Sequence, residues 1–320
     1  EFENVPAPAL RELAKLRPVS PGAEAVAIAQ DRAAEKAHFV RCGVPCAPYA
    51  VIESTDQLEA ALLQNLLPGI LKTARMGYDG KGQITVHAAA DLAAAWAELG
   101  KVACILEKRM ELDFEVSALV VRGYDDAVVV YPIAQNIHRD GILHISTVPA
   151  PSLKPIQEKK IIGAAKALIR KIDYVGVLCI EFFVLKNGDI IANEIAPRPH
   201  NSGHYTMDAC VTSQFQQQVR AMARLPLGDT RLLSPVAMLN ILGDAWFIKE
   251  GKQQATASEP AWERVLSHPD AKLHLYGKAS PLPGRKMGHV TVVGDDVDGV
   301  ALQAVNIRTA ITQRDDSKTE

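Results

Sequence analysis

The segment from Val177 to Ala196 constrains the fold most, because it predicts one β-hairpin. Two apolar runs flank Asn187-Gly188, and this dipeptide is the strongest short signal for a two-residue hairpin turn. If these two residues form the centre of the turn, the numbers of paired positions add up to 375, as 181 and 194 do. Residues that face each other across two strands have Cβ atoms roughly 4.5 to 5.5 Å apart. The sequence therefore predicts Glu181 and Glu194 side by side on one face of a hairpin.

Two facing carboxylates need a compensating partner. Like charges placed directly opposite each other are destabilising, and Glu181 interrupts an apolar run, where an uncompensated charge is costly. Carboxylates together with phosphate oxygens form the ligand set that Mg²⁺ prefers. We therefore interpret Glu181 and Glu194 as magnesium ligands, with Asn193 beside them. The alternative interpretation is the solvated face of an edge hairpin.

The remaining pattern alternates strands with helices, which predicts an α/β fold built from α+β lobes. Asp31 is expected to cap a helix that Gly43-Val44-Pro45 ends. Further helices are expected near residues 9–16, 55–65, 92–99, 156–172, 207–223 and 297–311. Strands are expected near 47–53, 69–75, 84–87, 104–107, 116–121, 127–132, 236–242, 272–277 and 288–293.

Composition excludes several classes of protein. Lys and Arg number 35 against 37 Asp and Glu, so the chain lacks the basic field that non-specific nucleic-acid binding requires. No run of 18 apolar residues occurs, and the first residues do not resemble a signal peptide, so we expect a cytoplasmic protein without a membrane partner. The five cysteines form no C-x-x-C pair, which argues against a disulfide framework or a zinc site.

A glycine-rich loop, residues 77–82, follows the strand that carries Lys72. Its three glycines allow the backbone N–H groups to approach phosphate oxygens closely, and a strand lysine beside such a loop is a natural phosphate clamp. The loop lacks the spacing of a Walker or a dinucleotide-binding motif, and an ordinary hairpin turn is the alternative. Glu107, at the end of an apolar strand, could accept a hydrogen bond from adenine or ribose.

Two polar clusters complete the candidate site. Arg198, His200, Asn201 and Ser202 follow the hairpin in a loop stiffened by proline and glycine, where a guanidinium fork and small donors could hold an oxyanion. Zinc ligation is an alternative for the histidines, but a helical H-E-x-x-H motif is missing. The turn 283–289 carries Arg285 and Lys286, which suit a phosphate group or a solvated basic turn.

Taken in order, these motifs resemble the ATP-grasp ligases. Residues 131–143, 196–204 and 283–289 are similar, more closely, to the N5-carboxyaminoimidazole ribonucleotide synthetases of purine biosynthesis, and the resemblance spans essentially the whole chain. It implies an ATP-dependent carbon–nitrogen ligase that uses bicarbonate and 5-aminoimidazole ribonucleotide, with carboxyphosphate as intermediate. It also implies a homodimer, with ATP and Mg²⁺ as cofactors.

Carried over position by position, the resemblance implies an ATP site lined by Arg32, Lys72, Gly77, Tyr78, Asp79, Gly80, Lys81, Gly82, Gln83, Glu107, Lys108, Arg109, Met110, Glu115, His138, Asn193 and Glu194. Lys72 would offset charge on the transferring phosphoryl group. Bicarbonate would contact Arg198, His200, Asn201 and Ser202, and the ribonucleotide would contact Tyr78, Asp79, Arg139, Arg285 and Lys286.

The same resemblance divides the chain. Residues 1–29 would be the remnant of a truncated or incomplete N-terminal βαβ lobe, residues 30–234 an ATP-grasp domain with a lid lobe at about 70–110, and residues 235–320 a small β-rich C-terminal lobe. Two other hypotheses remain: an ATP-grasp carboxylate–amine ligase with a different carboxylate substrate, and a nucleotide-binding protein without turnover.

Overall fold

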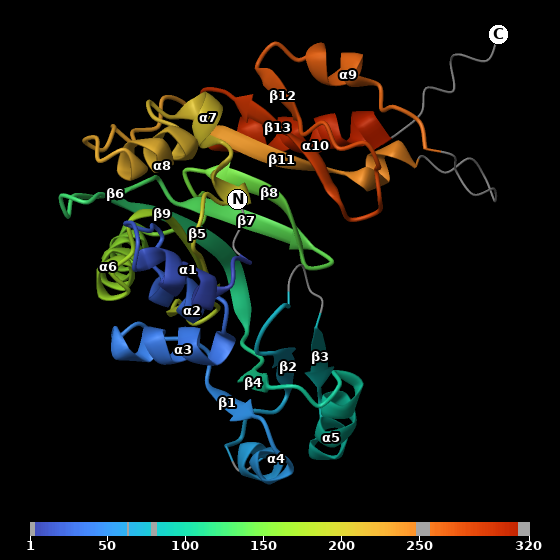
Figure 1. Cartoon of the computed structure of the whole chain (residues 1–320). Coiled ribbons are helices and arrows are strands. Elements are labelled where there is room, and N and C mark those ends of the chain that lie inside the picture. The colour runs from blue at the N-terminus through green and yellow to red at the C-terminus, as the bar shows by residue number, and fades with distance from the viewer. Residues whose placement is uncertain (1–3, 63, 78–81, 248–256, 313–320) are drawn as a thin grey trace, which may run out of the picture. The chain divides into compact units, whose positions relative to one another are not determined.

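The chain folds into two compact units in a computed structural model that describes residues 4–62, 64–77, 82–247 and 257–312 (Figure 1). Unit 1 combines residues 1–131, 153–200 and 214–228, and unit 2 combines residues 132–152, 201–213 and 229–320. The chain therefore crosses from one unit to the other immediately after His200. Among the described helices, none combines the length and the apolar composition that crossing a membrane requires.

Unit 1 contains a four-stranded antiparallel sheet in the order β1-β4-β2-β3. Its strands are β1 (Tyr49–Ile52), β2 (Gly69–Thr73), β3 (Gln83–Val86) and β4 (Cys104–Lys108). Helices α4 (Thr55–Leu62) and α5 (Ala89–Glu98) pack on one face of it (Figure 1). Leu58 and Trp96 from the helices join Leu71 and Leu106 from the strands in one buried cluster, which fixes the strand that carries Lys72.

Unit 1 also contains the predicted hairpin, β9 (Gly176–Leu185) and β10 (Ile190–Ala196), paired with β5 (Leu112–Arg122), which in turn pairs with β6 (Val128–Val130). The helices are α1 (Ala7–Ala14), α2 (Ala23–Ala29), α3 (Arg32–Arg41), α6 (Pro155–Lys171) and α8 (Gln214–Met222). The Asp31 carboxylate accepts the backbone N–H groups of Ala33 and Ala34, which confirms the predicted cap of α3. Apolar residues of α6 at helical spacing are buried, as predicted.

Unit 2 contains strands in the order β7-β8-β11-β13-β12: β7 (Ala134–Arg139), β8 (Ile142–Val148), β11 (Val236–Leu242), β12 (Ala271–Leu275) and β13 (Lys286–Val293). The helix α10 (Val297–Thr312) packs its apolar face on β11 and β13, with the short helix α9 (Trp262–Leu266) beside it. Three short helical segments complete the unit: η1 (Asn201–Gly203), α7 (Thr206–Ala209) and η2 (Gly243–Trp246).

The hairpin confirms the pairing of Glu181 with Glu194, although the predicted turn is wrong. The Leu185 N–H donates to Asp189 O at 2.8 Å, so the loop holds three residues instead of two, with Gly188 at a φ of +87°. This longer loop shifts the register by one residue. A bulge at Asn193 then shifts it back, so that Glu194 pairs with Glu181.

The predicted helix 207–223 is also wrong, because the structure has two helices there with an extended segment between them. Cys210 has φ −120° and ψ 156° and forms an isolated bridge with Leu232. The backbone N–H of Val211 donates to Arg231 O at 3.1 Å. Pairing with a distant segment outcompetes local helix formation here, since Val211 and Thr212 are weak helix formers.

Candidate active site

Helix α3 supplies two neighbouring side chains to the bulge in β10. Lys36 Nζ donates to Asn193 O at 3.0 Å, and the Ile195 N–H donates to the Glu35 carboxylate at 2.6 Å. A bulge leaves backbone polar groups outside the strand ladder, and buried groups of this kind need partners. Glu35 and Lys36 provide these partners on both sides of Glu194, so the bulge is a fixed feature of the site.

The pKa of Glu35 is raised to about 8. Burial of the carboxyl is the main cause, and the nearby charge of Glu194 raises it further. Lys36, Arg32 and the Ile195 N–H act in the opposite direction. Burial therefore favours the neutral form of the carboxyl with which Glu35 holds the bulge.

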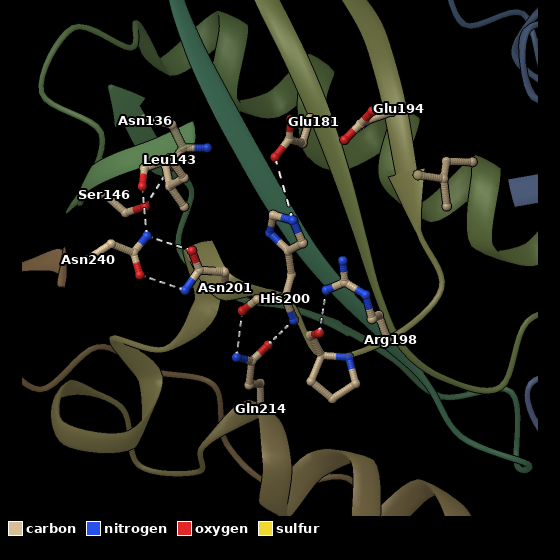
Figure 2. Close-up of polar contacts among 12 residues, drawn as sticks. Asn136, Leu143, Ser146, Glu181, Glu194, Arg198, His200, Asn201, Gln214 and Asn240 are labelled. Atoms are coloured by element: carbon tan, nitrogen blue, oxygen red, sulfur yellow. Dashed lines mark hydrogen bonds and ion pairs between the residues drawn. The ribbon is translucent and has the colours of Figure 1, made fainter. Parts of the chain in front are cut away.

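Glu181 and Glu194 lie beside each other on neighbouring strands, and the His200 ring lies near Glu181 (Figure 2). Arg32 Nη1 is 3.4 Å from Glu194 Oε2, and His200 Nε2 is 3.7 Å from Glu181 Oε1. The side-chain oxygen of Asn193 is buried without a hydrogen-bond partner within the described residues. The site thus combines two carboxylates with a neighbouring amide oxygen that has bonding capacity to spare.

This donor set fits Mg²⁺. Among the described residues, no three His, Cys, Asp or Glu side chains form a cluster that could hold a metal by themselves. A cation between Glu181 and Glu194 would therefore take its other ligands from a bound molecule or from water, as Mg²⁺ usually does. A zinc site with three protein ligands is not found in that part of the chain.

Lys72, Lys36 and Glu107 form a buried charged cluster. Lys72 Nζ donates to Glu107 Oε2 at 2.9 Å, and Lys36 Nζ lies 3.3 Å from Glu107 Oε1. Burial by itself raises the pKa of Glu107, but the two lysines, with a smaller contribution from Arg32, lower it below the usual value. Glu107 is therefore an ionised carboxylate between two ammonium groups.

The glycine loop is described only at its ends. Thr73 N donates to Gly82 O at 2.9 Å, and a Cβ added to Gly82, whose φ is +72°, would lie 2.8 Å from Thr73 Oγ1. Gln83 pairs with Lys72 in the sheet, so the loop leaves the strand beside that lysine, with Gly77 at its start. The predicted residues Tyr78, Asp79, Gly80 and Lys81 lie outside the described residues.

Four more predicted ATP contacts lie from the end of β4 into β5: Lys108, Arg109, Met110 and Glu115. Backbone bonds anchor this segment: Lys108 N donates to Pro48 O and Arg109 N to Pro68 O, each at 2.9 Å. Met110 packs against a small apolar cluster that includes residues 47, 185 and 191. Glu115 lies opposite Phe183 in the pairing of β5 with β9, so this segment reaches the sheet that carries the carboxylates.

The loop after the hairpin is fixed by backbone contacts. The N–H and C=O of His200 bond the side-chain amide of Gln214, both at 2.8 Å (Figure 2). The Arg198 guanidinium donates to Pro199 O at 3.1 Å. Contacts within unit 1 thus link Arg32, Lys72, Glu107, Glu181, Asn193, Glu194 and His200, with Lys36 joining Glu107 to Asn193, and Arg198 lies two residues before His200 in the chain.

In unit 2, Asn201 and Ser202 lie on η1 and are buried. The Asn201 amide exchanges two hydrogen bonds with the Asn240 amide, of 2.6 and 3.0 Å, and Asn240 also donates to Leu143 O at 2.9 Å (Figure 2). The position of Asn201 is therefore set by a residue of β11, 39 positions further along the chain.

The predicted ATP contact His138 and the predicted ribonucleotide contacts in unit 2 lie on β7 and around the start of β13. His138 and Arg139 end β7, and Arg139 lines a cavity of about 350 Å³ together with Gly284. The Arg285 guanidinium donates to Ser280 O at 2.8 Å, and Lys286 begins β13. The Arg285 hydrogen bond thus ties the turn to the preceding segment, and residues 286–289 of the predicted turn belong to β13.

Sequence reasoning missed four residues that position the site: Glu35, Lys36, Gln214 and Asn240. Lys36 follows Arg32 by four residues and so shares its helix face, a spacing that could have identified it. Gln214 and Asn240 give no comparable signal, since they act on distant segments through hydrogen bonds.

Two family models match the chain. The ATP-grasp domain matches residues 37–215, and the phosphoribosylaminoimidazole carboxylase C-terminal domain matches residues 236–303. The first match covers the carboxylate pair, Lys72 and the glycine loop. The fold is therefore that of an ATP-grasp protein.

Individual relatives define the family more narrowly. The N5-carboxyaminoimidazole ribonucleotide synthase of Brucella melitensis is 43% identical over 294 residues, which are 91% of this chain and 77% of the relative. The crystal structure of the Thermus thermophilus synthetase has a TM-score of 0.87 at 37% identity, covering 99% of this chain and 82% of that one. The Aspergillus clavatus enzyme, solved with ADP and 5-aminoimidazole ribonucleotide, has a TM-score of 0.86 at 29% identity and covers 97% of this chain and 80% of that one. The chain belongs to the N5-carboxyaminoimidazole ribonucleotide synthase family, which confirms the resemblance.

Proposed function

We propose that this chain is an ATP-dependent carbon–nitrogen ligase that carboxylates 5-aminoimidazole ribonucleotide with bicarbonate, giving the N5-carboxylated product, ADP and phosphate. The observation that carries the proposal is the Glu181–Glu194 pair, held opposite each other by a bulge and followed directly by the Arg198 and His200 loop. A carboxylate pair can bind MgATP, and the adjoining loop offers donors to a small oxyanion.

In this proposal the nucleotide binds to unit 1. Lys72 and the N–H groups of the glycine loop contact the phosphates, and the segment from Glu107 to Met110, with Glu115, contacts adenine and ribose. Arg32 and Asn193 lie beside the carboxylates, where they can contact phosphate oxygens or water. When bound, Mg²⁺ would supply charge neutralisation at the phosphates and align them for in-line transfer.

Bicarbonate occupies the loop after the hairpin, with Arg198, His200, Asn201 and Ser202 as its contacts. Its oxygen attacks the γ-phosphorus, the bond to the ADP oxygen breaks, and carboxyphosphate forms. The ribonucleotide, held by Arg139, Arg285 and Lys286, then presents its exocyclic amine to the carboxyl carbon. Phosphate leaves, the new carbon–nitrogen bond forms, and the amine loses a proton.

Carboxyphosphate is short-lived in water, so the reaction needs a site that excludes water during transfer. We assign this task to the lid lobe at about 70–110, and we assign Tyr78 and Asp79, which lie outside the described residues, to the ribonucleotide. This lobe carries Lys72 on β2, so closure and phosphate binding would be coupled.

The test is ADP release in carbon-dioxide-depleted buffer, with bicarbonate and 5-aminoimidazole ribonucleotide added separately and together. We expect rapid turnover only when both are present, with one equivalent of N5-carboxylated product per ADP. Turnover that ignores bicarbonate, or that responds to another carboxylate, would instead support a different ligase of the same fold.

We further propose a cytoplasmic homodimer, in keeping with a small-molecule biosynthetic reaction. We also propose that residues 1–29, 30–234 and 235–320 correspond to an N-terminal segment, the ATP-grasp domain and the C-terminal lobe. Light scattering at several protein concentrations tests the dimer.

A further inference from the structure

The buried cluster in unit 1 contains two ammonium groups and one carboxylate. Lys36 and Glu107 are 1% and 4% exposed, and Lys72 is 9% exposed. The carboxylate of Glu107 is shared, with one oxygen 2.9 Å from Lys72 Nζ and the other 3.3 Å from Lys36 Nζ. The cluster as a whole therefore carries one net positive charge.

Without Lys36, Glu107 and Lys72 would form a simple ion pair with no net charge. An ammonium group in such a buried pair attracts a phosphate weakly, since the carboxylate repels the same phosphate from nearly the same place. The ammonium group of Lys36, near the other carboxylate oxygen, offsets this repulsion. The charge of Lys72, the most exposed of the three side chains, then remains available to an anion.

The position of Lys36 rules it out as a direct phosphate ligand in this conformation. It is the least exposed member of the cluster, and its Nζ also donates to Asn193 O at 3.0 Å. Lys36 thus faces the Glu107 oxygen that Lys72 does not bond, and it connects Glu107 to the bulge next to Glu194.

We propose that Lys36 is a positioning residue that neutralises Glu107 and thereby keeps the positive charge of Lys72 available to a nucleotide phosphate. The proposal rests on the proposed function, in which Lys72 contacts the nucleotide. It gives Glu107 a second task. Its carboxylate orients Lys72, and Lys36 compensates the negative charge of that carboxylate.

The experiment is calorimetric titration of the full chain with MgADP at low salt, for wild type, Lys36→Met, Glu107→Gln, the double variant Lys36→Met/Glu107→Gln, and Lys72→Met. We expect Lys36→Met to weaken ADP binding at least tenfold. The double variant restores one net positive charge at Lys72, so it should bind ADP at least about threefold more tightly than Lys36→Met does, although it has also lost the Glu107 carboxylate.

A merely structural Lys36 predicts the opposite, because the double variant removes a second buried contact and should bind ADP no better than Lys36→Met. That result would overturn the proposal. If Lys36→Met does not fold, Lys36→Gln with and without Glu107→Gln gives the same comparison, and circular dichroism checks folding. If Lys72→Met binds ADP as wild type does, it is the assignment of Lys72 in the proposed function that fails.

Discussion

Replacing Asn240 by leucine tests how strongly the buried amide pair in unit 2 positions Asn201. The substitution keeps the side-chain size and removes three hydrogen bonds, two to Asn201 and one to Leu143 O. A buried hydrogen bond contributes about 1 kcal/mol net, so the free energy of unfolding should fall by about 3 kcal/mol. The melting temperature should fall by roughly 5 to 10 °C.

The catalytic effect should exceed what lost stability explains. Asn201 keeps its side chain but loses both contacts that orient its amide. A small misplacement of a substrate-holding group can cost about a hundredfold in rate. We expect kcat/KM for bicarbonate to fall between about tenfold and a hundredfold, measured well below the melting temperature, while KM for ATP changes little.

The matched control is Gln217→Leu in unit 1. Gln217 is also a buried amide, and it exchanges hydrogen bonds of 2.7 and 2.8 Å with the backbone of Gly228. It should lose comparable stability without a specific loss of bicarbonate use. If Asn240→Leu is destabilised but uses bicarbonate as wild type does, the orientation of Asn201 by Asn240 does not matter to the reaction, and our reasoning is refuted.

Three further predictions concern the carboxylate pair, the basic turn and a buried histidine. Glu194→Gln should lower turnover at least about a hundredfold across a magnesium titration, and high activity in this variant would contradict the metal assignment. The control Asp189→Asn, at the residue that follows the hairpin loop, should be near normal. Lys286→Ala should raise KM for the ribonucleotide more than KM for ATP. Equal changes in the two KM values would instead assign Lys286 to the ATP site. Burial, with the nearby His204 and His274, lowers the pKa of His289 to about 2, so folding favours its neutral form and stability is lost as the pH falls below about 6.5. Between pH 7 and 5, urea melts of His289→Gln should therefore lose about 2 kcal/mol less than wild type does, and equal losses would show that His289 does not titrate in this way.

The sequence predicted most element positions correctly, because those depend on nearby residues. The apolar spacing of α6 and the capping of α3 by Asp31 are local patterns that the fold leaves unchanged. The helix predicted over 207–223 fails where Cys210 bridges Leu232, since a backbone partner 22 residues away is invisible in a local pattern.

The candidate site divides in the same way. The pairing of Glu181 with Glu194 was predicted and is confirmed, although two details of the hairpin differ from the prediction. The loop is one residue longer and the bulge adds one residue to β10, and the two register shifts cancel. Residue types in a turn indicate a hairpin, but they do not reveal a bulge further along the strand. The bulge in β10 depends on Glu35 and Lys36, which contact it from helix α3.

What the sequence alone determined is therefore the set of chemical groups and their order: two carboxylates on one hairpin, a lysine before a glycine loop, and a polar loop after the hairpin. The tertiary structure decided how these groups are charged and aimed. Lys36 shares Glu107 with Lys72, and Asn240 orients Asn201, because burial removes water as a partner and leaves each polar group to bond whatever the fold brings within reach.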